Sequence, residues 1–227
     1  MSNDPYAALA ELAGGFIHEI KNHLSTLGLN LQLLAEDFQE PQNLRERRAL
    51  TRVQKLQTEC QRLVGVSNDF LRFARIKELK LEPTNLGKMV LEMIDFFTPT
   101  AEAANISIKT FFPADLPLVM LDRELFQQAL LNLMLNAEQA MPEGGEITLQ
   151  AFAENAKVCL SIIDTGKGMP PETMAKIFQP FFSTKPGGSG LGLPTTRRII
   201  ESHHGTMDVQ SEVGKGTKFT ICLPITP

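Results

Sequence analysis

The chain has 227 residues, of which 43% are hydrophobic, so it can form one large domain or two small ones with ordinary cores. Its formal net charge of −4 offers no strongly basic face for a phosphodiester backbone, and we expect no nucleic-acid partner. No apolar run approaches the roughly 20 residues that cross a bilayer, and the N-terminus lacks the blocks of a signal peptide. We therefore expect a soluble, cytoplasmic chain without a membrane span.

The cysteines and the most basic stretch suggest no special chemistry. Cys60, Cys159 and Cys222 are odd in number, widely spaced and set among apolar residues. That pattern favours reduced core thiols over disulfides or a zinc site, which fits the cytosol. The stretch from Arg45 to Arg52 is interpreted as a solvated helix face.

The N-terminal third has a helical period. Large apolar residues recur at steps of three and four from Leu9 to Phe38, a pattern typical of a coiled-coil or bundle seam. A break near Pro41 is followed by a second periodic run from Leu50 to Phe73. Two long antiparallel helices are predicted. Because an isolated hairpin cannot bury its apolar stripe, two copies should pair into a four-helix bundle, making the chain a homodimer.

After Pro83 the pattern changes to mixed helices and strands, so we expect two domains, residues 1–80 and 81–227. Helices are predicted at about 86–104, 122–140 and 193–203, and strands near 106–112, 118–121, 146–153, 158–164, 207–211 and 217–223. Short turns between neighbouring strands favour a mixed, largely antiparallel sheet covered by helices. The fold class is therefore multidomain, α followed by α+β.

The segment FIHEIKNH presents a histidine on the first helix. At about 100° per residue, His18 projects nearly opposite the apolar stripe, with Asn22 one turn on, whereas His23 points nearer the seam. A neighbouring carboxylate such as Glu19 can orient the proton on one ring nitrogen, so that the other nitrogen becomes the better nucleophile. The alternative is an ordinary solvated histidine.

Asp164 ends an apolar strand and is followed by a glycine turn, DTGKG. Its carboxylate could accept a hydrogen bond from the exocyclic amine of adenine, while Gly166 and Gly168 let the backbone approach a flat ring. A plain turn between a strand and a helix remains the alternative.

Asn132 and Asn136 lie one turn apart in an otherwise apolar helix. Buried amides need partners, so this pair should face a polar ligand, and one amide could complete the shell of a magnesium ion that keeps phosphate and water ligands. Hydrogen bonds between helices or at a helix cap are the alternative.

A glycine-rich string, GGSGLGL, comes directly before a helix with Pro194 in its first turn. The free N–H groups of that helix could hold phosphates. The string lacks the ending of a Walker loop, and no strand immediately precedes it as in a dinucleotide fingerprint. Lys185 could neutralise phosphate charge, or be only a solvated loop lysine.

Together these motifs resemble the bacterial two-component sensor histidine kinases over nearly the whole chain. HEIKN is similar to the H box, NLMLNA to the N box, DTGKG to the first glycine box, FQPFF to the F box and GSGLGL to the second glycine box. The variants look most like the nitrogen-regulation subgroup. The resemblance implies a dimeric four-helix bundle, then an α/β sandwich ATP-binding domain of the histidine kinase and chaperone ATPase type.

The resemblance also implies roles for residues. His18 would be the phosphoacceptor and Glu19 its base, Asn136 the magnesium ligand and Asp164 the adenine reader, while Asn22 would position a water that removes phosphate from a partner. The implied nucleotide-binding set is Asn132, Asn136, Asp164, Gly166, Gly168, Lys185, Gly188, Gly190, Leu191, Gly192 and Thr217. The cofactors would be ATP and Mg²⁺.

The implied partners are the receiver domain of a response regulator, which accepts the phosphoryl group on an aspartate, and a separate sensory domain or protein. His23 stands where the family usually has proline, so the bend expected just after His18 is either absent or depends on the preceding glycines, Gly14 and Gly15, instead. Gln139 stands where many members have lysine, which leaves phosphate neutralisation to Lys167, Lys185 and the lid.

Two other functions remain open from sequence. A nucleotide-responsive scaffold or phosphotransfer module would bind ATP without autophosphorylation. An ATPase of the chaperone and repair superfamily would share only the C-terminal half, and those proteins have a glutamate where this chain has Asn132.

Overall fold

The computed structural model describes residues 5–74, 79–185 and 187–225. Near the N-terminus it describes side chains only at Gly15, Ile17 and from Glu19 onward, so the side chain of His18 lies outside the description. Contacts divide the described chain into two units. One contains the N-terminal hairpin and Ser183–Leu191, and the other contains the remaining residues from Leu79 onward.

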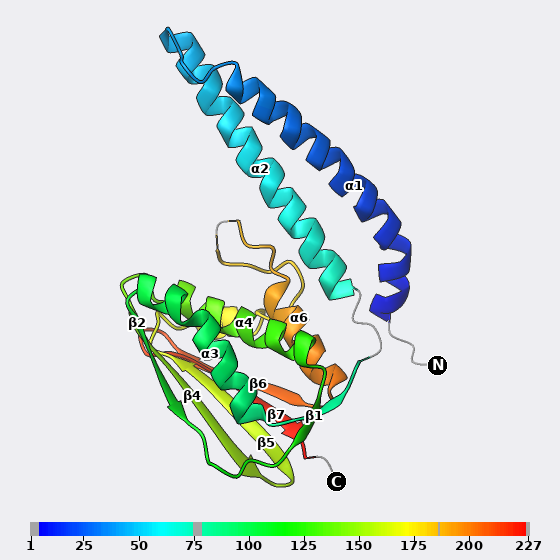
Figure 1. The fold of residues 1–227 in the computed structure, drawn as a ribbon, viewed down its shortest axis with the longest axis vertical. Helices are drawn as coiled ribbons and strands as arrows, with labels where there is room; N and C mark the ends of the chain where they lie inside the picture. The colour runs from blue at the N-terminus through cyan, green and yellow to red at the C-terminus, as the bar shows by residue number, and fades with distance from the viewer. Residues whose placement is uncertain (1–4, 75–78, 186, 226–227) are drawn as a thin grey trace. The chain divides into compact units, whose positions relative to one another are not determined.

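The hairpin consists of α1 (Pro5–Glu36) and α2 (Leu44–Ala74), each a continuous helix (Figure 1). Reciprocal capping starts α2. The Asn43 side chain accepts from the Glu46 N–H at 3.0 Å, and the Glu46 carboxylate accepts from the Gln42 N–H at 2.6 Å. These bonds satisfy N–H groups that a helix start leaves without partners.

The apolar seam divides into two sets within a single hairpin. Leu31, Val53 and Cys60 are buried between the helices, with Leu24 packed against them. The other set is exposed and consists of Leu27, Leu34, Leu56 and Leu63. Within each helix the members of a set are seven residues apart, the spacing of a heptad position. One hairpin therefore buries only half of its seam.

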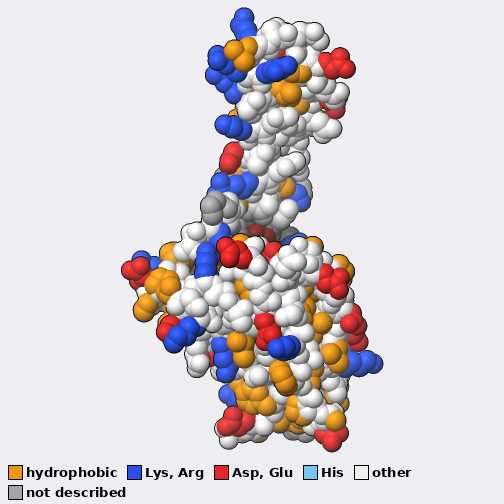
Figure 2. Space-filling model, turned by 90° about the vertical axis from the view of Figure 1, so that its left-hand side faces the viewer, with side chains coloured by type: hydrophobic (Ala, Val, Ile, Leu, Met, Phe, Trp, Pro, Cys, Tyr) orange, Lys and Arg blue, Asp and Glu red, His pale blue; other side chains and the backbone are white. Residues whose placement is uncertain are grey.

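The start of α2 is basic on its outer side. Figure 2 shows Lys and Arg side chains gathered at the end of the hairpin where the helices join. Arg45, Arg47, Arg48, Arg52 and Lys55 are all exposed. Among the described residues, no helix is both long and apolar enough to span a membrane.

The second unit is built on a five-stranded sheet in the order β2-β4-β5-β7-β6. The strands are β2 (Ile106–Phe111), β4 (Gly145–Glu154), β5 (Lys157–Asp164), β6 (Thr206–Glu212) and β7 (Gly216–Pro224). Only β2 and β4 pair in parallel; the other neighbours are antiparallel. A separate antiparallel pair joins β1 (Glu82–Thr84) to β3 (Val119–Leu121). The predicted mixed, largely antiparallel sheet is confirmed.

Helices cover one side of this sheet. Figure 1 shows α3 (Leu86–Ala103), α4 (Arg123–Gln139) and α6 (Gly192–Ser202) on the same side. The core between these layers contains Leu130, Leu133, Leu160 and Ile221, each no more than 1% exposed. Full burial of one such side chain stabilises the fold by roughly 1.5–3 kcal/mol. A short helix, α5 (Pro171–Met174), follows the DTGKG turn.

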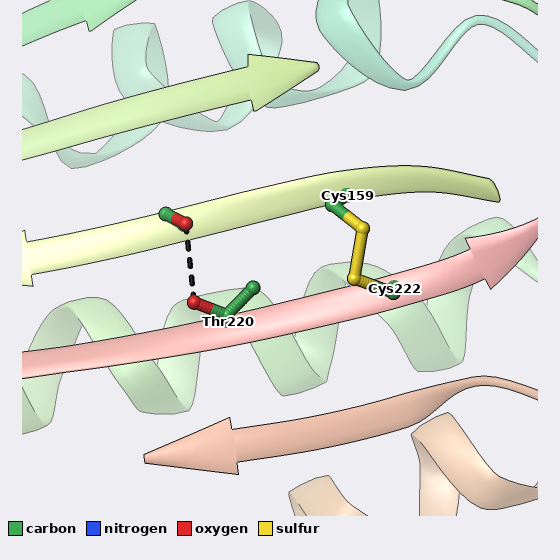
Figure 3. The surroundings of a disulfide bond; sticks show 4 residues. Cys159, Thr220 and Cys222 are labelled. Atoms are coloured by element: carbon green, nitrogen blue, oxygen red, sulfur yellow. Dashed lines mark hydrogen bonds between the residues drawn. A yellow bond between two sulfur atoms is a disulfide. The ribbon is translucent and has the colours of Figure 1, made fainter. Parts of the chain in front are cut away.

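The structure corrects one prediction about the cysteines. Cys159 on β5 and Cys222 on β7 are register partners and form a disulfide, with Cα atoms 4.0 Å apart (Figure 3). The expectation of reduced thiols at these positions was wrong, because it used spacing along the chain and not strand pairing. Cys60 is a buried free thiol, as expected.

Candidate functional site

Asp164 is the last residue of β5 and is 5% exposed. Its Oδ1 accepts from the Gly166 N–H at 2.9 Å and from the Thr217 N–H at 3.1 Å. Among the described residues, none donates to its other oxygen, Oδ2. Burial raises the pKa of the Asp164 carboxyl above its ordinary value, and the two N–H donors oppose that increase. One carboxylate oxygen is thus fixed by the backbone while the second can meet a ligand.

The loop after Asp164 is held from several sides. The Lys167 N–H donates to the Ala140 carbonyl at 3.1 Å, at the end of α4, and the Gly214 N–H donates to the Lys167 carbonyl at 2.8 Å. Ser211 accepts from the Met169 N–H at 2.9 Å. The turn therefore joins the end of the asparagine helix to the β6–β7 hairpin, two segments far apart in sequence.

Glycine is required at three places around this carboxylate. A Cβ on Gly166 would lie 2.7 Å from the Ala140 Cβ. A Cβ on Gly168 would overlap the Glu212 carbonyl oxygen, and one on Gly216 would overlap the Asp164 carbonyl oxygen. Gly168 and Gly216 also have φ values of 64° and 104°. The backbone packing around the predicted adenine site thus leaves no room for side chains at these positions.

The two asparagines of α4 have different surroundings. The Asn132 amide nitrogen donates to the Thr196 hydroxyl at 2.8 Å, and its amide oxygen faces the position that a Cβ on Gly192 would occupy. Asn132 therefore makes the bond between helices that the sequence left open as an alternative, joining α4 to α6. Asn136 lies half-buried one turn further along α4.

The glycine-rich segment runs into α6, which begins at Gly192. Lys185, Gly188, Gly190 and Leu191 all belong to Ser183–Leu191. Gly190 has a φ of 67°, a backbone conformation that glycine adopts readily, and Leu191 is fully buried. Within the second unit, the Arg197 guanidinium of α6 lies 4.9 Å from the centre of the Phe178 ring in the FQPFF segment.

The predicted phosphoacceptor segment lies within α1, which is helical through His18, Glu19 and Asn22. Glu19 and Asn22 are exposed. His23, predicted to point nearer the seam, is exposed too. The helix continues through His23 to Glu36, so no helix break follows this position.

Several residues that shape the site were not predicted from the sequence. Gly216 lies against Asp164, Ser211 bonds both to Met169 and to the Gly216 carbonyl, and Thr196 holds Asn132. The turn EVGKG signals Gly216 only weakly, because the contact depends on the pairing of β5 with β7. Among the described residues, no group of three or more His, Cys, Asp or Glu side chains could hold a metal ion.

Comparisons with known proteins agree with this arrangement. Residues 121–227 match the family model described as histidine kinase-, DNA gyrase B- and HSP90-like ATPase. The sensor histidine kinase ZraS of Escherichia coli K12 is 35% identical over 219 residues, which cover 96% of this chain and 46% of ZraS. Sporulation kinase E of Bacillus subtilis is 30% identical over 98% of this chain and 29% of its own length. The chain thus spans about half the length of ZraS, and less of the sporulation kinase.

Solved structures give the same result. The catalytic domain of the histidine kinase ThkA is 32% identical with a TM-score of 0.60, covering 66% of this chain and 98% of that domain. Full-length ShkA in complex with AMPPNP is 29% identical with a TM-score of 0.74, covering 95% of this chain and 46% of ShkA. These matches do not favour the scaffold or the chaperone-type ATPase, and they leave the nitrogen-regulation subgroup a prediction. The chain belongs to the bacterial two-component sensor histidine kinases.

Proposed function

We propose that this chain is an ATP-dependent protein-histidine autokinase that phosphorylates His18 and passes the phosphoryl group to an aspartate of a response regulator. The observation that supports this most directly is the Asp164 carboxylate, whose Oδ1 is held by two N–H donors while Oδ2 has no donor among the described residues. A fixed, buried acceptor of this kind suits the exocyclic amine of adenine. Membership of the family links that pocket to the histidine on α1.

The remaining nucleotide contacts follow from the same proposal. Gly166, Gly168 and Thr217 would surround the base, while the start of α6 at Gly192 and the glycines of the preceding segment would hold phosphates with N–H groups. Lys167 and Lys185 would balance phosphate charge. In such transfers most of the catalysis is positioning and electrostatic stabilisation of a loose transition state.

A magnesium ion fits the residues that are present. Mg²⁺ usually keeps several waters and is bound through substrate phosphates and one or two oxygen ligands from the protein. The half-buried Asn136 would supply one amide oxygen from α4. When bound, the ion would neutralise charge on the transferred phosphoryl group. Asn132, already bonded to Thr196, would hold α6 in position.

The exposed half of the hairpin seam supports a homodimer. Leu27, Leu34, Leu56 and Leu63 are between 42% and 55% exposed in one chain. Pairing of two hairpins would bury these leucines in a four-helix bundle. We place the activity in the cytoplasm, with sensory input from a separate domain or protein.

The test is incubation with γ-labelled ATP and Mg²⁺, followed by acid and alkali treatment, since phosphohistidine is lost in acid and kept in alkali. We expect His18→Gln to lose all label but to bind an ATP analogue normally. Asp164→Asn should weaken analogue binding about 10- to 100-fold, because the adenine amine would no longer donate a hydrogen bond to a charged carboxylate. Equal labelling of His18→Gln and the parent would reject His18, with the exposed His23 and His204 next to test.

Asn22 provides a second prediction at the same helix. It is exposed one turn after His18, and its amide could orient a water towards a phosphoaspartate but cannot replace an imidazole as acceptor. Asn22→Ala should therefore keep autophosphorylation and slow the loss of phosphate from the cognate regulator, measured as its decay with kinase and ADP present. Decay at the parent rate would mean that Asn22 has no such role.

A further inference from the structure

The disulfide between Cys159 and Cys222 bridges two central strands of the ATP-binding unit. The pair lies on the β5–β7 ladder, in register, with Cα atoms 4.0 Å apart. That spacing is closest to the non-hydrogen-bonded pairs of an antiparallel ladder, where side chains approach each other most closely. The two sulfur atoms therefore stay neighbours for as long as the ladder is intact, whether or not they are bonded.

The ladder does not depend on this bond. Eight residue pairs join β5 to β7, from Lys157 with Pro224 to Asp164 with Thr217. Next to the disulfide, the hydroxyls of Ser161 and Thr220 hydrogen-bond across the strands at 3.1 Å (Figure 3). On the opposite face, Val158, Leu160 and Leu223 are each no more than 1% exposed. Because the core and the backbone pairing fix the register, the bond can open and close without rearranging the sheet.

The covalent loop contains most of the candidate nucleotide site. The two cysteines are 63 residues apart, and the segment between them includes Asp164, Gly166, Gly168, the glycine-rich string and α6. Thr217 lies in the same segment, so of the site residues only those on α4 fall outside it. A bond that closes this loop restricts the unfolded chain, and the loop is long enough for a sizeable effect on stability.

The two sulfur atoms differ in access to solvent. Cys159 is 5% exposed, whereas Cys222 is half-buried even in the bonded form. A dissolved disulfide reagent would therefore reach Cys222 first, since access helps to decide which thiol reacts. Disulfides in compartments that hold thiols reduced are usually transient or redox-sensing. This step rests on the cytoplasmic location that we propose together with the kinase function.

We propose that Cys159 and Cys222 form a redox-reversible modification site that controls the stability of the ATP-binding unit. The oxidant is a low-molecular-weight disulfide of the glutathione class. The Cys222 thiolate attacks one of its sulfurs and releases one thiol, leaving a mixed disulfide. The Cys159 thiolate then attacks the Cys222 sulfur and releases the second thiol. Two protein thiols are oxidised, one small disulfide is reduced to two thiols, and Cys60 takes no part.

The first test is a titration of the purified chain in buffers of reduced and oxidised glutathione, with free thiols counted by alkylation and mass spectrometry. We expect Cys159 and Cys222 to interconvert reversibly, and the thermal midpoint of the oxidised form to be about 10 °C higher than that of the reduced form. Thiols that stay free in the most oxidising buffer would reject the proposal. So would a bond that persists in the most reducing one, because it would then be a permanent staple.

Single variants test the order of attack. Serine is a conservative replacement here, because the Ser161–Thr220 pair shows that the same ladder accommodates hydroxyls. With oxidised glutathione, Cys159→Ser should accumulate one glutathione adduct at Cys222, whereas Cys222→Ser should remain unmodified. An equally fast adduct on Cys159 would overturn this order. The double variant should have the thermal midpoint of the reduced parent in every buffer.

The two proposals can fail separately. The thiol titration uses no ATP, so a chain that titrates as described but takes no label from ATP would reject only the proposed kinase function. A chain that takes label normally but shows no reversible thiol pair would reject only this inference.

Discussion

His203 joins the end of α6 to the start of α4. Its side chain is 2% exposed, and Nε2 accepts from the Asp122 N–H at 2.9 Å. Since a backbone N–H can only donate, the ring proton must lie on Nδ1, which then donates to the Ile199 carbonyl at 2.7 Å. The Asp122 side chain in turn caps α4 by accepting from the Leu125 N–H at 3.2 Å. Only the neutral imidazole can make both bonds.

This arrangement predicts a pH dependence of stability. Burial lowers the pKa of His203 below its ordinary value near 6.5, an effect that the Ile199 carbonyl and Asp122 oppose. The unfolded chain therefore binds a proton at a higher pH than the folded chain does. The free energy of unfolding should fall as pH drops from about 6.5 towards the lower, folded pKa.

Urea unfolding between about pH 7.5 and pH 5.5 would measure this slope. We expect His203→Gln to be less stable than the parent near neutral pH but to lose this part of the pH dependence. His204→Gln is the matched control, because that neighbouring histidine is exposed. If His203→Gln and the parent show the same slope, protonation of His203 does not limit acid stability.

Individual residues show what sequence could and could not predict at this scale. The position of Asp164 at the end of a strand was predictable, because five of the six residues before it, VCLSII, are apolar. Its donor on Thr217 was not, since the two residues are 53 positions apart and meet only when β5 pairs with β7. The same limit applies to Asn132, whose bond to Thr196 spans 64 positions.

At the scale of elements, long periodic segments were predictable, whereas of the short ones only β3 was predicted, near 118–121. The predicted helix near 86–104 is α3 at Leu86–Ala103, and the strand near 158–164 is β5 at Lys157–Asp164. The strand β1 and the helix α5 were missed, because three or four residues are too few to show a period. The disulfide was missed for a related reason. The alternation of side chains along a strand shows which residues share a face, but it does not reveal which strand lies beside it.

The β6–β7 hairpin offers a matched pair of glycines. Gly214 and Gly216 have φ values of 79° and 104°, so alanine is strained at both. At Gly214 an added Cβ meets nothing within 4 Å, whereas at Gly216 it would overlap the Asp164 carbonyl oxygen. Gly214→Ala should lower the free energy of unfolding by roughly 1–2 kcal/mol. Gly216→Ala should lower it by roughly 3 kcal/mol or more, because β5 and β7 must separate locally.

Denaturant unfolding of the two variants checks this difference, and binding of an ATP analogue checks its consequence. Only Gly216→Ala should also weaken binding of the analogue, since the backbone that it displaces belongs to Asp164. Equal losses of stability in both variants would mean that β5 and β7 can separate near Gly216 at little cost. The loss of stability would then come from backbone strain alone.

At the scale of the whole molecule, the hairpin is the part that leaves large apolar side chains of its own seam exposed. The second unit buries its own core, with Phe97, Phe126 and Ile147 no more than 1% exposed. In the hairpin, the buried residues Leu31, Val53 and Cys60 and the exposed leucines share one heptad pattern. The pattern predicted a bundle seam, but sequence alone could not show which positions are buried within one chain and which stay exposed.

That division gives a test of the homodimer with an internal control. Leu27 and Leu33 are similarly exposed, at 50% and 53%, but six residues at 100° each place them about 120° apart around α1. Leu27 shares its direction with Leu34 on the exposed half of the seam, and Leu33 does not. Sedimentation equilibrium of Leu27→Glu and Leu33→Glu should therefore give different results.

For Leu27→Glu we expect the dissociation constant of the dimer to rise at least about 100-fold, because symmetry removes two buried leucines, each worth roughly 1.5–3 kcal/mol, and places two carboxylates in the seam. Leu33→Glu should associate like the parent. Neither variant should change the affinity of the second unit for an ATP analogue, since that unit has a separate core. A parent chain that is monomeric at every concentration would reject the dimer, and equal weakening by both substitutions would place the interface on a different face of α1.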